Sequence, residues 1–518
     1  MEMVEETKVF SESLIWSLQR DYFKENGIEA WKNSEVPHYI TNNPFLAKSY
    51  AEIVFHFFMD IERMNGKVNE KIYLIELGGG TGRLAYHFLT YFQELCQSVS
   101  ASIPEFCYIL SDLPSKNIDF WNCHPQLKPF VEQGNLDFSV FDVEKDTSIH
   151  LIHSNKTISI QSLSQPLLVV ANYFFDSIPH DLFYFDNGTV FECLVHLTSN
   201  SNTENPSPAE QLKSAHLNYQ YKIIENSPYE ERFFNDLLEN YKTHIKKSHV
   251  LIPSVGIRCL ERLRQFSNEG ILLLSADKGY HCISELDEQT EPALVYHGSF
   301  SLTVNYHAFK LYGEDQGGQT FFTPHSHQHL NLIGLLIVPG AGLYTNTKAA
   351  YDRFISGFGP DDFFSLKKYF EKHFHEMKQG QLLSFIRLSG YDAHLFKQCI
   401  PHFRKILSEI SSQDKQGMFV MIQRVWEMYY PIGEDQDLAF DMGTMLYQMD
   451  LYEEAIVFFM RSLEGFGQAA PTYYNLAICY YMLANEKALD YLEICLQLDP
   501  SHMEAATLRT SIASKGGV

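Results

Sequence analysis

A glycine-rich turn between a buried strand and a helix constrains the fold of this chain more than any other segment. Residues 73–88 read YLIELGGGTGRLAYHF, an apolar run that ends in an acid, then a glycine cluster, then the start of a helical pattern. Gly78, Gly80 and Gly82 allow backbone conformations that other residues avoid, and the N-terminus of the following helix presents free N–H groups. The segment therefore predicts an α/β domain in which this turn binds a ligand.

The segments around the turn support this fold class. The strand candidates between residues 71 and 175 are KIYLIEL, FCYILSD, LDFSVFD and PLLVVANYFF, and helical patterns separate them. Such alternation is typical of a mainly parallel sheet. Two β-rich runs flank Asn187-Gly188, which predicts a hairpin. We therefore expect a Rossmann-like α/β domain with a hairpin insertion over residues 71–350.

The two ends of the chain have a different pattern. Residues 1–70 carry helical spacing and predict a helical segment that covers the ligand site, and residues 351–435 predict a helical connector. Within residues 436–518, Gly443 and Ala477 lie 34 positions apart in two similar segments, which is the tetratricopeptide period. We expect an all-α, tetratricopeptide-like domain here. Two unrelated amphipathic helical hairpins are the alternative.

Charge and composition narrow the class of partner and the compartment. The formal net charge of −24 argues against nucleic acid or an anionic membrane surface as a partner. Nine cysteines without a CxxC pair indicate reduced thiols rather than a disulfide framework. The acidic start MEMVEETKVF is unlike a targeting peptide, and no apolar run is long enough for a membrane helix. We expect a cytoplasmic protein.

The glycine spacing distinguishes two kinds of cofactor. Dinucleotide-binding turns carry glycines at relative positions 1, 3 and 6, so that a pyrophosphate lies on the helix N-terminus. Here the glycines occupy positions 1, 3 and 5, and Arg83 stands at the sixth. A turn preceded by an acid suits a ligand with an ammonium group and no phosphate, such as S-adenosylmethionine. A nucleotide-dependent oxidoreductase is the less favoured reading.

ELGGGTGRLA resembles motif I of the class I S-adenosylmethionine-dependent methyltransferases. The resemblance implies that Gly78, Gly80 and Gly82 approach the methionyl part of the cofactor and that Glu76 lies near its ammonium group. It also implies that the domain over residues 71–350 has the class I methyltransferase fold.

Two further acids stand where that fold places cofactor ligands. Asp112 ends the run YILSD, in the position that accepts the ribose hydroxyls, and Asp142 ends FSVFD, in the position that reads the adenine edge. From the residues alone, either acid is also suited to a turn or a helix N-cap.

A narrower resemblance covers residues 20–345. The stretch VVANYFFDSIPHDLF is similar to the Asn/His–Glu–aromatic–aromatic–Asp–x–x–Pro motif of the MidA-like methyltransferases, a family that includes a complex I assembly factor acting on a protein arginine. The resemblance implies that Asn172 and Asp176 face the transferred methyl group. It also implies that Thr41, in VPHYITNNPFL, belongs to a segment that folds over the cofactor. For Asp176 the alternative role is a helix N-cap before Pro179.

The motif departs from the family at one position, because Tyr173 stands where the family has glutamate. Carboxylates orient a guanidinium through paired hydrogen bonds, so this change leaves the acceptor open. Another acid could take over the role of the glutamate. Alternatively, the aromatic residues 173–175 could surround an apolar or cationic side chain.

The run His325, His327, His329 raises a metal hypothesis, because alternation places all three on one face of a strand. No cysteine or carboxylate lies beside them in the sequence, and we predict no metal.

We expect a methyltransferase that acts on a protein, with the repeats binding the partner through a concave groove. The alternative is a catalytically inactive interaction protein that keeps the methyltransferase fold.

Overall fold

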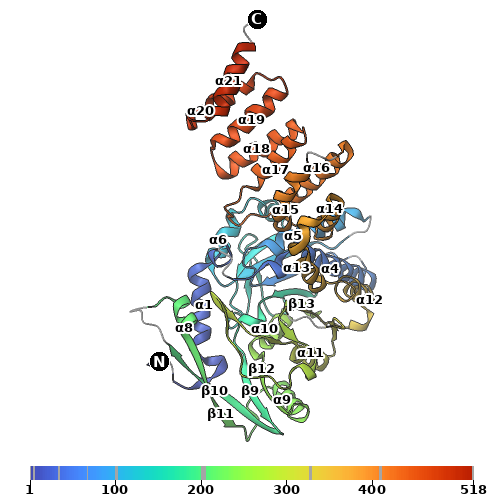
Figure 1. Cartoon of the computed structure of the whole chain (residues 1–518). Helices are drawn as coiled ribbons and strands as arrows, with labels where there is room; N and C mark the ends of the chain where they lie inside the picture. The colour runs from blue at the N-terminus through green and yellow to red at the C-terminus, as the bar shows by residue number, and fades with distance from the viewer. Residues whose placement is uncertain are drawn as a thin grey trace. The chain divides into compact units, whose positions relative to one another are not determined.

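The computed structural model describes residues 2–3, 6–32, 36–66, 68–99, 103–199, 206–325, 329–407 and 411–515. The chain forms two compact units, Met1–Ser365 and Leu366–Val518 (Figure 1). The boundary between them falls within residues 351–435, the segment that the sequence analysis assigns to a helical connector.

Seven strands form the central sheet of the first unit. They are β3 (Ile72–Leu77), β4 (Phe106–Asp112), β5 (Leu136–Val140), β8 (Leu167–Asn172), β13 (Ile271–Asp277), β18 (Gln319–Phe322) and β19 (Asn331–Ile337). Their order across the sheet is β18-β19-β13-β8-β3-β4-β5. The five strands from β13 to β5 are parallel, and β19 runs antiparallel to both of its neighbours. This confirms the predicted mainly parallel sheet, and the four strand candidates become β3, β4, β5 and β8.

The strand order reverses next to the glycine turn. The chain runs from β3 outward to β4 and β5, and it then returns to place β8 on the other side of β3. Both neighbours of β3 are parallel to it, with Ile72 opposite Phe106 and Leu74 opposite Leu168. Open α/β sheets bind ligands at such a reversal, outside the carboxyl ends of the strands. The turn at residues 78–82 begins at this edge, directly after β3.

Helices cover both faces of the central sheet (Figure 1). On one face α4 (Pro44–Asn65) packs against α5 (Arg83–Ser98). On the other face α9 (Arg232–His244), α10 (Ser254–Arg264) and α11 (Tyr306–Asp315) share one hydrophobic core with Tyr73, Ile75 and Leu77 of β3. Because side chains alternate along a strand, Glu76 points to the opposite face, where α4 and α5 lie.

A second, antiparallel sheet of six strands accompanies the central one. Its strands are β1 (Glu2–Met3), β2 (Lys8–Val9), β9 (Asp181–Asp186), β10 (Thr189–Ser199), β11 (Ala215–Ile223) and β12 (Lys247–Ile252). The predicted hairpin is confirmed, since Asn187 (φ 45°) and Gly188 (φ 85°) join β9 to β10 in the left-handed conformations that a type I′ turn needs. The sequence predicts only this hairpin. Residues 2–3 and 8–9 form strands rather than helix, because β10 offers them backbone hydrogen-bonding groups.

The N-terminal segment then becomes helical, as predicted, with α1 (Leu14–Asn26), α2 (Glu29–Lys32) and α3 (Tyr39–Asn42). The side chain of Ser13 caps α1 by accepting a hydrogen bond from the backbone N–H of Ile15. Gln19, on the buried face of α1, donates to the carbonyl of Ser177 (3.1 Å) and accepts from the N–H of Phe300 (3.0 Å). These bonds fix α1 against the turn that follows β8.

The second unit is helical. It begins within α13 (Pro360–His373). The α-helices that follow among its described residues are α14 (Gln379–Leu388), α15 (Ala393–Ile406), α16 (Ser412–Glu427), α17 (Leu438–Gln448), α18 (Tyr452–Phe466), α19 (Ala470–Met482), α20 (Lys487–Leu498) and α21 (Met503–Lys515). From α17 onward each helix packs against the next. A Cβ atom on Gly443 would lie 2.8 Å from the ring of Phe459, so α17 and α18 approach more closely than alanine would permit. The helical C-terminal region is confirmed, and its assignment to the tetratricopeptide class stays a prediction.

Two general features bear on the compartment. Among the described residues, no helix is both long enough and apolar enough to cross a membrane. The nine cysteines are free thiols, and most of them are buried. The cytoplasmic compartment stays a prediction.

Candidate active site

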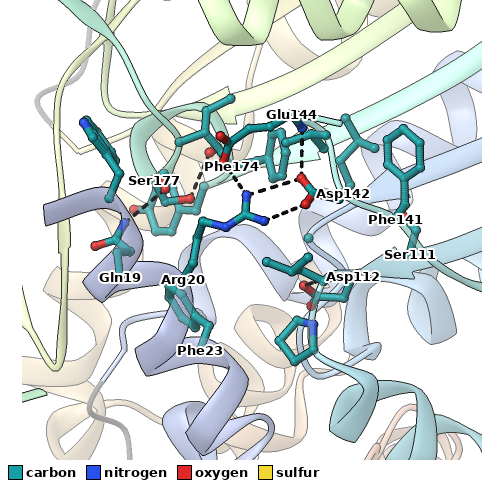
Figure 2. Close-up of a pocket in the computed structure, with 18 of the residues that line it drawn as sticks. Gln19, Arg20, Phe23, Ser111, Asp112, Phe141, Asp142, Glu144, Phe174 and Ser177 are labelled. Carbon is teal, nitrogen blue, oxygen red and sulfur yellow. Dashed lines mark hydrogen bonds and ion pairs between the residues drawn. The ribbon is translucent and has the colours of Figure 1, made fainter. Parts of the chain in front are cut away.

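A cleft of about 820 Å³ opens at the carboxyl ends of β3, β4, β5 and β8 (Figure 2). The strand ends contribute Gly78, Asp112, Asp142 and Phe174, and the N-terminal helices contribute Trp16, Arg20 and Trp31. The predicted cofactor edge of the sheet therefore carries a cleft, and the N-terminal segment forms one side of it.

The glycine turn needs its glycines for two separate reasons. Gly78, Gly80 and Gly82 have φ values of 67°, 52° and 76°, all in the left-handed region that L side chains disfavour. A Cβ atom on Gly78 would also lie 2.9 Å from Cδ2 of Phe174, a residue of the cleft wall. Bare backbone is therefore required at this point. Gly82 is the residue before α5, and its carbonyl accepts the N–H of Tyr86 (3.1 Å) in the first turn of that helix.

Glu76 is buried beside the turn. Its Oε2 atom accepts a hydrogen bond from the hydroxyl of Tyr108 (2.8 Å), and its side chain is 5% exposed. Burial raises the pKa of Glu76 to about 8, and the charge of Asp112 adds to the shift. A cation beside it would favour the ionised form. Glu76 is not among the described residues that line the cleft, and its contact with the cofactor ammonium stays a prediction.

Asp112 ties the glycine turn to the end of β4. Its Oδ2 atom accepts hydrogen bonds from the N–H of Gly80 (2.9 Å) and from Nδ2 of Asn117 (2.9 Å), and its Oδ1 atom accepts from the N–H of Leu113 (2.8 Å). Burial raises the pKa of Asp112 in spite of these three bonds. Asp112 is one of the residues that line the cleft, and its contact with the ribose hydroxyls stays a prediction.

Asp142 forms an ion pair that the sequence analysis does not foresee. Arg20 of α1 binds it with two hydrogen bonds, Nη2 to Oδ2 (2.6 Å) and Nη1 to Oδ1 (3.2 Å), and also contacts Glu144. Figure 2 shows the guanidinium reaching from α1 to both acids. Hydrogen bonds from Arg20 and from the N–H of Glu144 lower the pKa of Asp142 although burial opposes them. The acid predicted to read adenine is thus also the attachment point of α1.

Thr41 and Asn172 contact each other, and neither is among the described residues that line the cleft. Nδ2 of Asn172 donates to the carbonyl of Thr41 (3.4 Å), and Oδ1 of Asn172 accepts from the hydroxyl of Tyr50 (2.8 Å). The hydroxyl of Thr41 bonds to the carbonyl of His38 (3.3 Å) within its own turn. The contact connects the N-terminal segment to the end of β8. The roles predicted for Thr41 and Asn172 toward the ligand stay predictions.

The turn after β8 contacts a second acid, Asp277, which the sequence analysis does not single out. Tyr173 has a φ of 46°, and its hydroxyl donates to the carbonyl of His329 (3.3 Å). The backbone N–H of Asp176 donates to Oδ2 of Asp277 (3.2 Å), the last residue of β13. A signal for Asp277 exists, since it ends a buried apolar run, GILLLSAD, as Asp112 does.

The histidine run does not assemble as a unit among the described residues. His325 lies 3.0 Å from Oδ2 of Asp361 and 3.8 Å from Oδ2 of Asp362, while the carbonyl of His329 accepts from Tyr173. His327 lies outside the described residues. A second group of metal-ligating residues comprises His281, Cys282 and Glu285. Each of these groups makes hydrogen bonds or ion pairs with protein partners.

Residues 51–288 match the model of a family described as "Putative S-adenosyl-L-methionine-dependent methyltransferase". The cofactor expected from the sequence, S-adenosylmethionine, is the cofactor of this family. The match covers the glycine turn and the five parallel strands β3, β4, β5, β8 and β13. A comparison with curated protein sequences finds no match.

Two crystal structures of Burkholderia thailandensis proteins resemble this chain at low similarity. One protein, described as a candidate methyl transferase and bound to S-adenosyl-homocysteine, is 13% identical with a TM-score of 0.39, over 61% of this chain and 74% of that chain. The other, described as an uncharacterised protein of the same superfamily, is 11% identical with a TM-score of 0.39, over 65% and 90%. Such scores do not establish a shared fold, so the fold assignment rests on the strand order.

Proposed function

We propose that this chain is an S-adenosylmethionine-dependent methyltransferase that modifies a nitrogen-bearing side chain of a protein. The observation that carries the proposal is the glycine turn at the strand-order reversal, opening into a cleft lined by Asp112 and Asp142. The match of residues 51–288 to a methyltransferase family supports the same reaction class. The family match does not identify the methyl acceptor or the role of the repeats, and both are part of the proposal.

The residues present fit the cofactor. Gly78 exposes backbone where a Cβ would collide with Phe174, and the carboxyl groups of Asp112 and Asp142 lie along the same cleft. When bound, the cofactor supplies a methyl group activated by a positively charged sulfonium. The chain then has to align the acceptor, exclude water and take up one proton. Trp16, Trp31 and Phe174 line the cleft and exclude water. Asp176, next to the cleft residue Ser177 in the turn after β8, is the candidate for the proton.

Tyr173 supports the alternative of an inactive interaction protein. Its ring replaces the carboxylate of the resembled family, and its hydroxyl is engaged by the carbonyl of His329. Under that alternative, the fold would be kept with or without a bound cofactor, no methyl group would be transferred, and the repeats of the second unit would carry the function. The repeats fit either reading, because stacked helical hairpins present a surface for a partner.

A direct test is calorimetric titration of the full chain with S-adenosylmethionine, followed by transfer of a labelled methyl group to cell proteins. Micromolar binding together with labelled protein would support the enzyme. Binding without labelling would favour the interaction protein. No binding would overturn the enzyme and leave an interaction protein built on this fold. Glutamate in place of the exposed Met482 and Met503 should reduce labelling but not cofactor binding if the repeats hold the acceptor.

Arg20→Gln should speed the release of S-adenosylmethionine about tenfold, with most of the affinity change in the dissociation rate. The reason is that the substitution removes the ion pair that fastens α1 across the cleft to Asp142. Stopped-flow tryptophan fluorescence suits the measurement, because Trp16 and Trp31 line the cleft. Glu144→Gln is the matched control, since it keeps the Arg20–Asp142 pair and should have a smaller effect. Equal release rates in the wild type and in Arg20→Gln would contradict this role of α1.

A further inference from the structure

Asp277 and Asp176 place two carboxyl groups together at the carboxyl ends of adjacent strands. β8 and β13 pair in parallel, with Asn172 opposite Ala276, so the chain after Asn172 and the residue after Ala276 lie at one edge. The N–H of Tyr173 continues the pairing by donating to the carbonyl of Ala276 (2.9 Å). Asp277, the last residue of β13, is fully buried, and Asp176 is 5% exposed.

The backbone holds this arrangement at some conformational cost. Tyr173 adopts a φ of 46°, an unusual value for an aromatic residue, which directs the chain into a short turn at Phe175–Ser177. That turn brings the N–H of Asp176 to Oδ2 of Asp277 (3.2 Å). The N–H of Lys278 donates to Oδ1 of the same carboxyl (2.8 Å). Strained residues of this kind cluster at functional sites.

The groups around the pair set its charge. Lys278 follows Asp277 directly after the end of β13, and phenols act on the pair from α4 (Tyr50), from α11 (Tyr306) and from the β8 turn (Tyr173). Burial raises the pKa of Asp176 to about 7, and burial together with the charge of Asp176 raises the pKa of Asp277 well above its usual value. Near neutral pH, Asp277 is therefore the protonated member, and Asp176 gains its charge as the pH rises through about 7.

Resting on the proposed function, we infer that the pair supplies the negative charge at the reacting centre and that Asp277 is the positioning residue that holds Asp176. Asp176 and Asp277 are not among the described residues that line the cleft, but Tyr173, Phe174 and Ser177, on either side of Asp176 in the chain, do line it. The phenol of Tyr50 lies within electrostatic range of both Asp277 and Glu76, the acid beside the glycine turn. The resembled family has a glutamate at the position of Tyr173. Asp277 thereby supplies a second carboxyl group beside Asp176 in place of that glutamate.

The methyl acceptor that suits this pair of carboxyl groups is a nitrogen. The nitrogen that takes the methyl group uses its lone pair, so an N–C bond forms as the S–C bond breaks, and the S–C electron pair stays on sulfur. An acceptor that starts as an ammonium or a guanidinium must give up one proton before or during this step, and the ionised Asp176 is the group that takes it. A pair that holds one proton and one charge suits an amine or a guanidinium better than a carboxylate or an apolar carbon.

The test compares the affinities of S-adenosylmethionine and S-adenosyl-homocysteine by calorimetry from about pH 5.5 to about pH 7, below the range in which their amino groups titrate. The two ligands share the ammonium and the adenosine and differ in the methyl group and the sulfonium charge. The affinity ratio should rise roughly fourfold over this range in the wild type, as Asp176 ionises. In Asp176→Asn the ratio should stay flat. In Asp277→Asn, where the amide donates to Asp176, the rise should move to lower pH.

Glu76→Gln is the matched control, because it removes another buried acid whose charge acts on the ammonium common to both ligands. It should lower both affinities and keep the rise in their ratio. A flat ratio in the wild type, or the same rise in Asp176→Asn, would overturn the inference while leaving the proposed function standing. Failure of the wild type to bind either ligand would instead remove the proposed function itself.

Discussion

Gly78→Ala should weaken the binding of S-adenosylmethionine about a hundredfold, which corresponds to about 2.8 kcal/mol. Two effects act together at this position. The φ of 67° becomes strained for any residue with a Cβ atom, at a cost of about 1–2 kcal/mol. The new Cβ atom would also lie 2.9 Å from Cδ2 of Phe174, so the ring or the turn has to move. Since Phe174 is part of the cleft wall, that movement changes the shape of the cofactor site.

Gly66→Ala is the control that separates the effect of backbone strain from the loss of the cofactor site. Gly66 has a φ of 72° at the end of α4, and a Cβ atom there would meet nothing within 4 Å. Both variants should therefore lose stability through backbone strain in a thermal unfolding experiment, by about 1 kcal/mol in Gly66→Ala and by more in Gly78→Ala, whose Cβ atom also meets Phe174. Only Gly78→Ala should lose affinity for the cofactor in calorimetry. A Gly78→Ala protein with wild-type affinity would show that the turn does not hold this ligand.

Features encoded within a few residues could be predicted from the sequence. An apolar run that ends in an acid, followed by glycines and a helix, describes β3, the turn and α5 without reference to the rest of the chain. Asn187-Gly188 specifies its own hairpin, because only a few residues accept φ values of 45° and 85° in succession. Gly443 indicates a close helix contact for a similar local reason.

Features that depend on partners distant in sequence could not be predicted in this way. Arg20 and Asp142 are 122 residues apart, and Asp176 and Asp277 are 101 apart. Nothing near Arg20 in the sequence distinguishes it from a solvent-exposed charge on a helix. Asp277 does carry a strand-end signal, but its meaning depends on which strand lies next to β13, and the strand order is a property of the whole sheet. The pairing of residues 2–3 and 8–9 with β10 depends in the same way on a free sheet edge.

Asp60 of α4 is a third case of this kind, and its loss should have the largest effect on stability. Its side chain is fully buried, and its two oxygens accept hydrogen bonds from the N–H and Nδ2 of Asn346, from the N–H and hydroxyl of Thr347, and from Arg63. The carboxylate therefore satisfies the first N–H groups of α12 (Thr345–Tyr351) from a position 286 residues away.

We expect Asp60→Ala to lower the free energy of unfolding of the first unit by about 3 kcal/mol, because it leaves several buried donors without an acceptor. Tryptophan fluorescence during urea unfolding is a suitable probe, since Trp16, Trp31 and Trp121 belong to that unit and Trp426 alone to the other. Arg63→Ala is the matched control. The Arg63 side chain is 49% exposed, so its removal should cost less than about 1 kcal/mol.

Asp60→Ala should lower the stability of the first unit without changing its affinity for the cofactor. Asp60 lies ten residues along α4 from Tyr50, about 15 Å by helical rise, so the folded fraction of Asp60→Ala should bind S-adenosylmethionine with unchanged affinity. If Asp60→Ala and Arg63→Ala were equally destabilising, the exposed ion pair would account for the contribution of Asp60. A large loss in Asp60→Ala alone would show that the buried carboxylate, by capping α12, joins the end of the methyltransferase-like unit to its first long helix.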